Sequence, residues 1–174
     1  MDGKWKEAED KAVNLPDDDP IVFELYVQLL YTGRLPCKSE SETPADSEQE
    51  YVVLSKLYVL AEKIQDIDAR RVAMDSLLSL SRDTRETRGE YMVPGLEAVS
   101  TIYSGTLEPC AARRLFVDLY TCKPGGDWFD KSQPYPTEFL AELVAALLEN
   151  RAPHENWALE ATPSMYHDKD DIKP

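Results

Sequence analysis

Apolar side chains occupy almost every position between residues 22 and 31. The polar residues Glu24 and Gln28 form only a thin stripe on a helix. Asp19 before Pro20 favours a helix start, because the carboxylate can accept from free N–H groups and proline has no N–H to lose. Gly33 favours a helix end, since glycine adopts a left-handed conformation without steric cost. The pattern therefore predicts a helix over residues 20–32 that is buried on nearly all sides.

Further segments place apolar residues at helical spacing, namely about 48–64, 66–81, 94–103, 109–120 and 136–150. The link between the first two is short, so they should form a helical hairpin. Val13 and Leu15 alternate with Asn14, which is typical of a short strand. The sequence thus predicts a mainly α-helical bundle with one short strand. The positions expected to face the core are Leu54, Leu57, Tyr58, Ala61, Ile64, Ile67, Met74, Leu77, Leu78, Leu96, Val99, Ile102, Tyr103, Ala112, Leu115, Phe116, Leu119, Phe139, Leu140, Leu143, Val144, Leu147 and Leu148.

Polar and charged stretches separate these segments. Residues 37–49 are acidic and poor in apolar side chains, so we expect a surface loop there. Residues 82–91 alternate in charge and are expected to be solvated. From residue 151 the chain is polar and interrupted by proline, which is typical of a disordered tail. We therefore expect a first unit over 1–81, a helical extension over 82–150 and a tail over 151–174.

The chain is strongly acidic, with a formal net charge of −14. This balance argues against nucleic acid and against an anionic membrane surface, since both attract basic proteins. No apolar run is long enough to span a bilayer, and the first residues lack the apolar segment of a secretory signal. Cys37, Cys110 and Cys122 are widely spaced and odd in number, so we expect free thiols. These features favour a cytoplasmic or nuclear protein.

No set of residues in the sequence indicates catalysis or cofactor binding. His154 and His167 both lie in the polar tail, where a solvated acidic segment explains them better than a metal site. Arg113 and Arg114 are adjacent, and a solvated helix face is the simplest interpretation; a contact to an acidic peptide is the alternative. We expect no enzyme activity, no cofactor and no metal.

An ordered series of motifs resembles the BTB/POZ family, in the form found in filamentous fungi. The stretch VNLPDDDPIVFELYVQLLYTGRLP, residues 13–36, is similar to the middle of that domain. It combines a short strand, an acidic turn before Pro20, and a helix ending in Tyr31, Thr32 and Gly33. The stretch LSKLYVLAEKIQDIDARRVAMDSLL, residues 54–78, is similar to the family's next helix and the start of the one after. The resemblance covers about residues 3–80.

This resemblance implies an incomplete BTB/POZ domain of α+β type. In the family, the helix ending in Tyr-Thr-Gly packs among other helices and against a sheet. The family's first strands and helical hairpin would precede residue 1, and they carry much of the usual homodimer interface, so we do not expect homodimerisation. Residues 95–150 resemble the helical extension of fungal versions. We expect this extension to pack against the first unit or against its neighbours, and to cover apolar surface that the missing half would bury.

The resemblance also implies a partner-binding segment. Members that serve cullin ubiquitin ligases often carry a hydrophobic-x-Glu motif just before the short strand, and Trp5, Lys6 and Glu7 occupy those positions. An exposed tryptophan is a plausible binding hot spot, because it buries a large area with few rotatable bonds. The simpler alternative is that Trp5 packs on its own domain.

Three functional hypotheses remain open from the sequence. The first is a non-enzymatic interaction module of BTB/POZ type, an adaptor whose partner is a cullin scaffold or another BTB protein. The second is a truncated, non-functional fragment or a mis-started product of a longer BTB protein. The third is an all-helical enzyme or small-molecule binder, which the residues support least.

Overall fold

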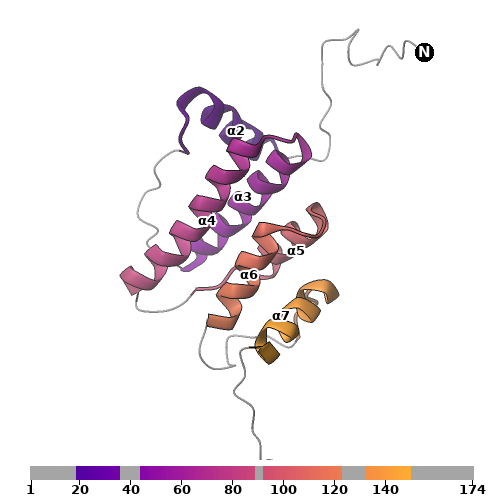
Figure 1. Cartoon of the computed structure of the whole chain (residues 1–174). Coiled ribbons are helices and arrows are strands. Elements are labelled where there is room, and N and C mark those ends of the chain that lie inside the picture. Colours follow the sequence, from indigo (N-terminus) through magenta and orange to yellow (C-terminus); the bar gives the residue numbers. More distant parts are fainter. Residues whose placement is uncertain (1–18, 36–43, 89–91, 123–131, 150–174) are drawn as a thin grey trace, which may run out of the picture.

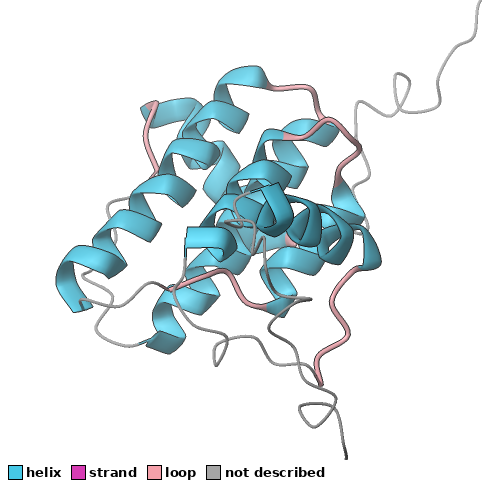
Figure 2. Ribbon diagram, turned by 60° about the horizontal axis from the view of Figure 1, so that its bottom comes forward, coloured by secondary structure: helices cyan, strands magenta, loops and turns pink. Residues whose placement is uncertain are grey.

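A computed structural model describes residues 19–35, 44–88, 92–122 and 132–149 of the chain. Within these ranges the structure is helical and contains no strand, which confirms the mainly α class (Figures 1 and 2). The helices are α2 Pro20–Thr32, α3 Pro44–Lys63, α4 Ile67–Arg88, α5 Leu96–Gly105, α6 Ala111–Cys122 and α7 Thr137–Glu149. The expected strand at 13–15 and the expected tail at 151–174 lie outside the described residues.

Helix α2 begins and ends where its sequence predicts. The Oδ1 atom of Asp19 accepts a hydrogen bond from the N–H of Ile21 at 3.0 Å. Gly33 adopts the left-handed conformation with φ at 67°, and its N–H donates to the carbonyl of Leu29 at 2.8 Å. Both ends are therefore fixed by local capping chemistry.

Helices α3 and α4 form the expected hairpin, but each is longer than predicted. Helix α3 starts at Pro44, so the last residues of the expected acidic loop are helical. Proline at the first helical position and Asp46 in the first turn both suit a helix N-terminus. Helix α4 continues through the charged residues to Arg88, because the first glycine or proline after Asp66 is Gly89. The expected boundary between residues 81 and 82 therefore lies inside α4.

The turn between α3 and α4 is held by one carboxylate. The Oδ1 atom of Asp66 accepts from the N–H groups of Asp68 at 3.1 Å and Ala69 at 3.0 Å, and so caps α4. Its Oδ2 atom accepts from the Tyr26 hydroxyl at 3.0 Å, which ties α2 to the hairpin. The N–H of Ala69 in particular lowers the pKa of Asp66, because it stabilises the charged carboxylate.

Helix α3 is the centre of the fold and packs against α2, α4 and α5 (Figure 1). One hydrophobic cluster joins residues of α2 through α7, so the expected first unit and extension share a core. Its largest fully buried side chains are Tyr51, Leu54, Leu57, Leu60, Leu77, Ile102, Phe116, Tyr120 and Phe139. Several expected core positions instead lie at the surface, namely Ile64, Ile67, Val144, Leu147 and Leu148.

Helices α3 and α5 approach closely at Gly105. A Cβ atom at this position would lie 2.4 Å and 2.6 Å from the two Cγ atoms of Val59. Real Cβ atoms do not come so close to other carbons, so Val59 would have to move. The end of α5 therefore reaches α3 because residue 105 has no side chain.

We expect Gly105→Ala to lower the free energy of unfolding by roughly 1–3 kcal/mol, because the added methyl group overpacks the contact with Val59. Alanine by itself favours a helix more than glycine does. A loss of stability would therefore result from the clash between the new methyl group and Val59. Urea unfolding followed by circular dichroism measures the effect. The double variant Val59→Ala, Gly105→Ala should regain much of the loss. A single variant as stable as the parent would contradict the close approach.

Candidate interaction surfaces

One side of α2 is apolar and open to solvent. Phe23, Leu30 and Tyr31 are exposed on this side, and together with the half-buried Val27 they recur at helical spacing and form what we call the outer face of α2. Phe23 is 43% exposed, Leu30 58% and Tyr31 87%. Only Val22 and Leu29 of this helix are buried. The prediction that the helix is buried on nearly all sides is therefore wrong for the described part of the chain.

The packing of α2 explains this exposure. Among the described residues α2 contacts only α3 and α4. Leu29 packs against Ala61 and Ala69, whose small side chains let α2 lie close to the hairpin. Helix α5 packs on another part of α3 and shares the hydrophobic core with it, but it does not reach the outer face of α2 (Figure 1).

Arg113 is buried between α5, α6 and α7, with its side chain 6% exposed. Its Nε atom donates to the Thr106 hydroxyl at 3.2 Å, and its Nη2 atom donates to the carbonyl of Tyr103 at 3.0 Å and to that of Thr106. Its guanidinium carbon lies 4.5 Å from the centroid of the Tyr103 ring. The expected solvated helix face is therefore wrong for Arg113, although Arg114 is exposed.

Three carboxylates surround the remaining nitrogen of Arg113. The Nη1 atom lies 3.7 Å from Glu108, 3.6 Å from Glu138 and 3.7 Å from Glu142. Glu142 also accepts from the Tyr103 hydroxyl at 2.6 Å. One guanidinium thus links the end of α5, the following loop and α7. We call Arg113, Tyr103, Thr106, Glu108, Glu138 and Glu142 the Arg113 cluster.

Sequence reasoning missed this role, although a signal was present. Arg113 lies three and four positions before Phe116 and Val117, which are buried. That spacing places it on the apolar face of α6 rather than the solvated one. A charged residue on such a face is typical of a buried, paired group.

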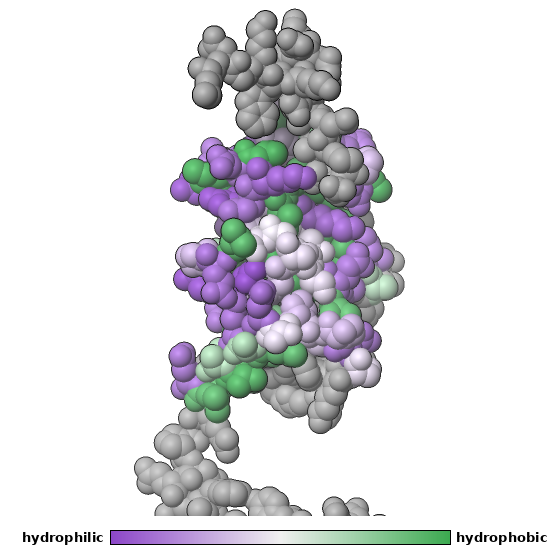
Figure 3. Space-filling view, turned by 90° about the vertical axis from the view of Figure 1, so that its right-hand side faces the viewer, coloured by the Kyte–Doolittle hydropathy of each residue, from purple (hydrophilic) through white to green (hydrophobic). Residues whose placement is uncertain are grey.

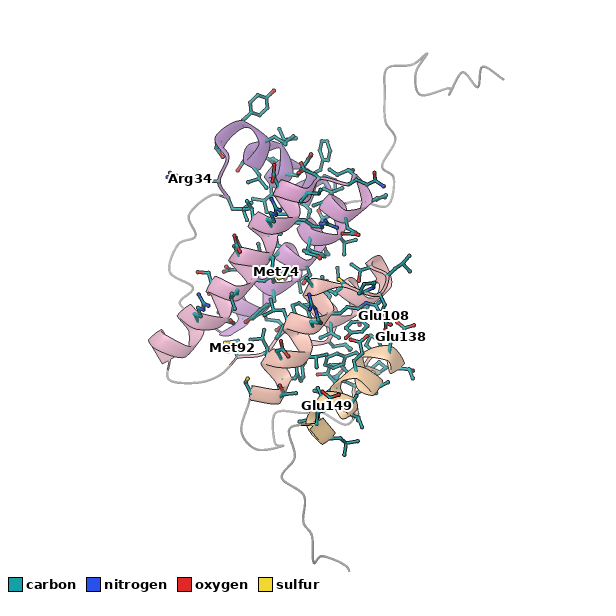
Figure 4. The ribbon with its side chains drawn as sticks, in the orientation of Figure 1. Arg34, Met74, Met92, Glu108, Glu138 and Glu149 are labelled. Atoms are coloured by element: carbon teal, nitrogen blue, oxygen red, sulfur yellow. The ribbon has the colours of Figure 1, made fainter. Side chains whose placement is uncertain are left out.

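A groove of about 670 Å³ runs between α6 and α7 beside the Arg113 cluster. Helix α6 contributes Arg113, Arg114, Val117 and Asp118, and α7 contributes Glu142, Ala145, Ala146 and Glu149. The preceding loop adds Glu108, Pro109 and Cys110. Figure 4 shows Glu108 and Glu138 together at one end of this region and Glu149 at the far end of α7. The groove thus has an apolar floor and a mostly acidic rim.

A second hollow of about 440 Å³ lies between the α3–α4 hairpin and the start of α6. Arg70, Arg71 and Arg114 line it, but Arg70 pairs with Glu62 and Arg71 pairs with Asp68 at 3.4 Å. At its wall the Tyr58 hydroxyl and the Cys110 sulfur lie 3.7 Å apart. Most of its positive charge is therefore already engaged.

The two cysteines among the described residues are free thiols. Cys110 is buried and Cys122 is exposed. Among the described residues, no group of three or more His, Cys, Asp or Glu side chains could hold a metal ion. None of the helices in these ranges has the length and apolarity needed to cross a membrane. Trp5, Lys6, Glu7, Cys37, His154 and His167 lie outside the described residues.

We expect Arg113→Met to lower the free energy of unfolding by roughly 2–4 kcal/mol, because it leaves buried carbonyl oxygens without donors. Arg113→Lys should lose less stability than Arg113→Met but still be less stable than the parent, since an ammonium lacks the planar fork of donors. Urea unfolding measures both. Arg114→Met is the matched control on the same helix and should stay within about 0.5 kcal/mol of the parent. Equal losses at both positions would contradict the role of Arg113.

Buried tyrosines should make the fold sensitive to alkali. Burial, together with the contact to Cys110, raises the pKa of Tyr58 to about 12. Burial and the hydrogen bond to Glu142 raise the pKa of Tyr103, and burial raises that of Tyr120. A tyrosine in the unfolded chain ionises near pH 10, so above that pH the unfolded state binds fewer protons than the folded state.

We therefore expect the free energy of unfolding to be constant through neutral pH and to fall above about pH 10, by up to about 1.4 kcal/mol per pH unit for each such tyrosine. Urea midpoints measured between about pH 8 and pH 11 test this. Tyr58→Phe should reduce the slope. A midpoint that stays constant across this range would show that the tyrosines titrate alike in both states.

Comparison with known proteins gives no relative for the chain. No protein-family model, no curated protein and no solved structure matches it. The similarity to the BTB/POZ family therefore depends on the quoted motifs, and what it implies about partners is a proposal.

Proposed function

We propose that this chain is a non-enzymatic protein–protein interaction module of BTB/POZ type that binds its partner through the outer face of α2. The observation that carries the proposal is the exposure of Phe23, Leu30 and Tyr31 on one side of a single helix. Their apolar surface is favourable to bury, at about 25 cal/mol per Å². Apolar side chains gathered on an exposed face are typical of sites where other proteins bind.

The chemistry of this face suits a protein partner. Aromatic side chains such as Phe23 and Tyr31 are enriched at binding hot spots, because they bury a large area and lose few rotamers. Glu24 and Gln28 border the apolar residues on the same helix and provide a polar rim. In Figure 3, apolar side chains appear at the upper end of the described body, where α2 and the α3–α4 turn both lie.

The resemblance to the family suggests which partner. In BTB/POZ domains the helix ending in Tyr-Thr-Gly packs against a sheet, whereas the described part of this chain contains no strand. Among the described residues the outer face of α2 is exposed, which supports a contact with another chain there. We propose a cullin scaffold or another BTB protein as that chain, with Trp5, Lys6 and Glu7 contributing to the contact. The net charge of −14 favours such a partner over nucleic acid or an anionic membrane.

We expect Leu30→Glu to weaken binding to the purified amino-terminal domain of a cullin by at least about tenfold, because it places a charge on the exposed apolar face. Biolayer interferometry with the immobilised chain measures the affinity. Gln28→Glu is the matched control, since it adds the same charge to the polar side of the same helix. It should leave the affinity nearly unchanged.

Three further results would test the contact by Trp5 and Glu7, the choice of a cullin partner, and the outer face of α2 separately. Undiminished binding by Trp5→Ala, Glu7→Ala would remove those residues from the contact. No binding of the cullin domain would reject the cullin partner, and light scattering of mixtures with a BTB protein would then test the other. If that mixture also shows no complex, or if Leu30→Glu and Gln28→Glu behave alike, the outer face of α2 is not the binding surface.

A further inference from the structure

We infer that the groove between α6 and α7 binds a basic amphipathic helix of a partner protein. This site is separate from the outer face of α2 and goes beyond the function proposed above.

The shape of the groove matches a helix. Its walls are two stripes at helical spacing, Cys110, Arg114 and Val117 on one side and Glu142, Ala145 and Glu149 on the other. The stripe on α7 spans about two helical turns, or roughly 10 Å. Alanine at positions 145 and 146 leaves space where larger side chains would close the groove. A partner helix can fill this space with apolar residues at i, i+3 or i+4, and i+7.

The charge around the groove selects a basic partner. Arg113 is already surrounded by Glu108, Glu138 and Glu142, so its positive charge is more than balanced. Asp118 and Glu149 line the groove and form no ion pair among the described residues. Arg114 is the remaining cation on the rim. Lysine or arginine flanking an apolar stripe would therefore meet complementary charge along most of the rim.

The hollow between the α3–α4 hairpin and the start of α6 is a less suitable site for an acidic partner than the groove is for a basic one. Two of its three arginines, Arg70 and Arg71, are already paired with Glu62 and Asp68. Its volume of about 440 Å³ is also smaller than the 670 Å³ of the groove. Arg114 lines both the groove and the hollow. Reversing its charge should therefore have opposite effects on the binding of a basic helix and of an acidic ligand.

The test uses a fluorescent synthetic peptide of about 18 residues, built from Leu, Ala and Lys so that one face of its helix is apolar. A scrambled peptide of the same composition controls for attraction by charge alone. Fluorescence anisotropy with the full chain at about 0.15 M salt gives both affinities. We expect the patterned peptide to bind at least about tenfold more tightly than the scrambled one. Equal affinities would overturn the inference.

Two substitutions locate the site. Ala145→Trp fills the groove without changing charge, so it should reduce binding of the patterned peptide to the level of the scrambled one. Ala141→Trp is the matched control, because residue 141 is exposed on α7 but does not line the groove. It should bind like the parent. Circular dichroism melts confirm that both variants fold, and unchanged binding by Ala145→Trp would overturn the inference.

Reversing the charge of Arg114 tests the sign of the partner's charge. Arg114→Glu should strengthen binding of the patterned peptide by roughly two- to fivefold, as expected for one exposed charge contact. A variant that binds more tightly cannot be explained by damage to the fold. Weaker binding by Arg114→Glu would overturn the choice of a basic partner and favour an acidic ligand.

Discussion

The arrangement of α5, α6 and α7 depends on one buried guanidinium. Helix α5 ends at Gly105, and its last carbonyl groups have no partner within the helix. Arg113 supplies donors to the carbonyls of Tyr103 and Thr106 and at the same time faces Glu138 and Glu142 of α7. A planar group with several fixed donors can donate to both carbonyls while its remaining nitrogen faces the carboxylates at ion-pair distance, a geometry that an ammonium does not reproduce. The groove lies beside this group, between α6 and α7.

The core of the fold is well packed, whereas parts of its surface leave large apolar side chains exposed. Helix α3 is surrounded by α2, α4 and α5, and five of its large apolar side chains are almost completely buried, namely Tyr51, Leu54, Leu57, Tyr58 and Leu60. Helices α2 and α7 lie at opposite ends and each use only one side for packing, as Figure 1 shows. Both leave large apolar residues in contact with water. Figure 3 shows apolar side chains at the upper end of the described body, where α2 and the α3–α4 turn lie, and at its lower end. A partner would therefore gain the most binding free energy by burying the apolar surface of α2 or of α7.

Local features of this fold were predictable from sequence, and relations between helices were not. Asp19 and Gly33 identified the ends of α2 correctly, because caps act within a few residues. The charged residues after position 81 suggested solvent rather than helix, yet nothing before Gly89 stops α4. Which side of α2 is covered depends on Ala61 and Ala69 in other helices. The groove likewise arises from the relative placement of α6 and α7, which periodicity within each helix does not encode.

The acidity of the chain affects how its apolar surfaces can be used. Two copies that each carry a net charge of −14 repel one another as they approach, which opposes association through the apolar faces. Salt limits this repulsion to about 8 Å in physiological conditions, so the charges close to each surface decide the outcome. Near the groove these are Asp118, Glu142 and Glu149, opposed on the rim by Arg114. The same carboxylates that disfavour a second copy attract a basic helix, so charge selects the partner while apolar burial supplies the affinity.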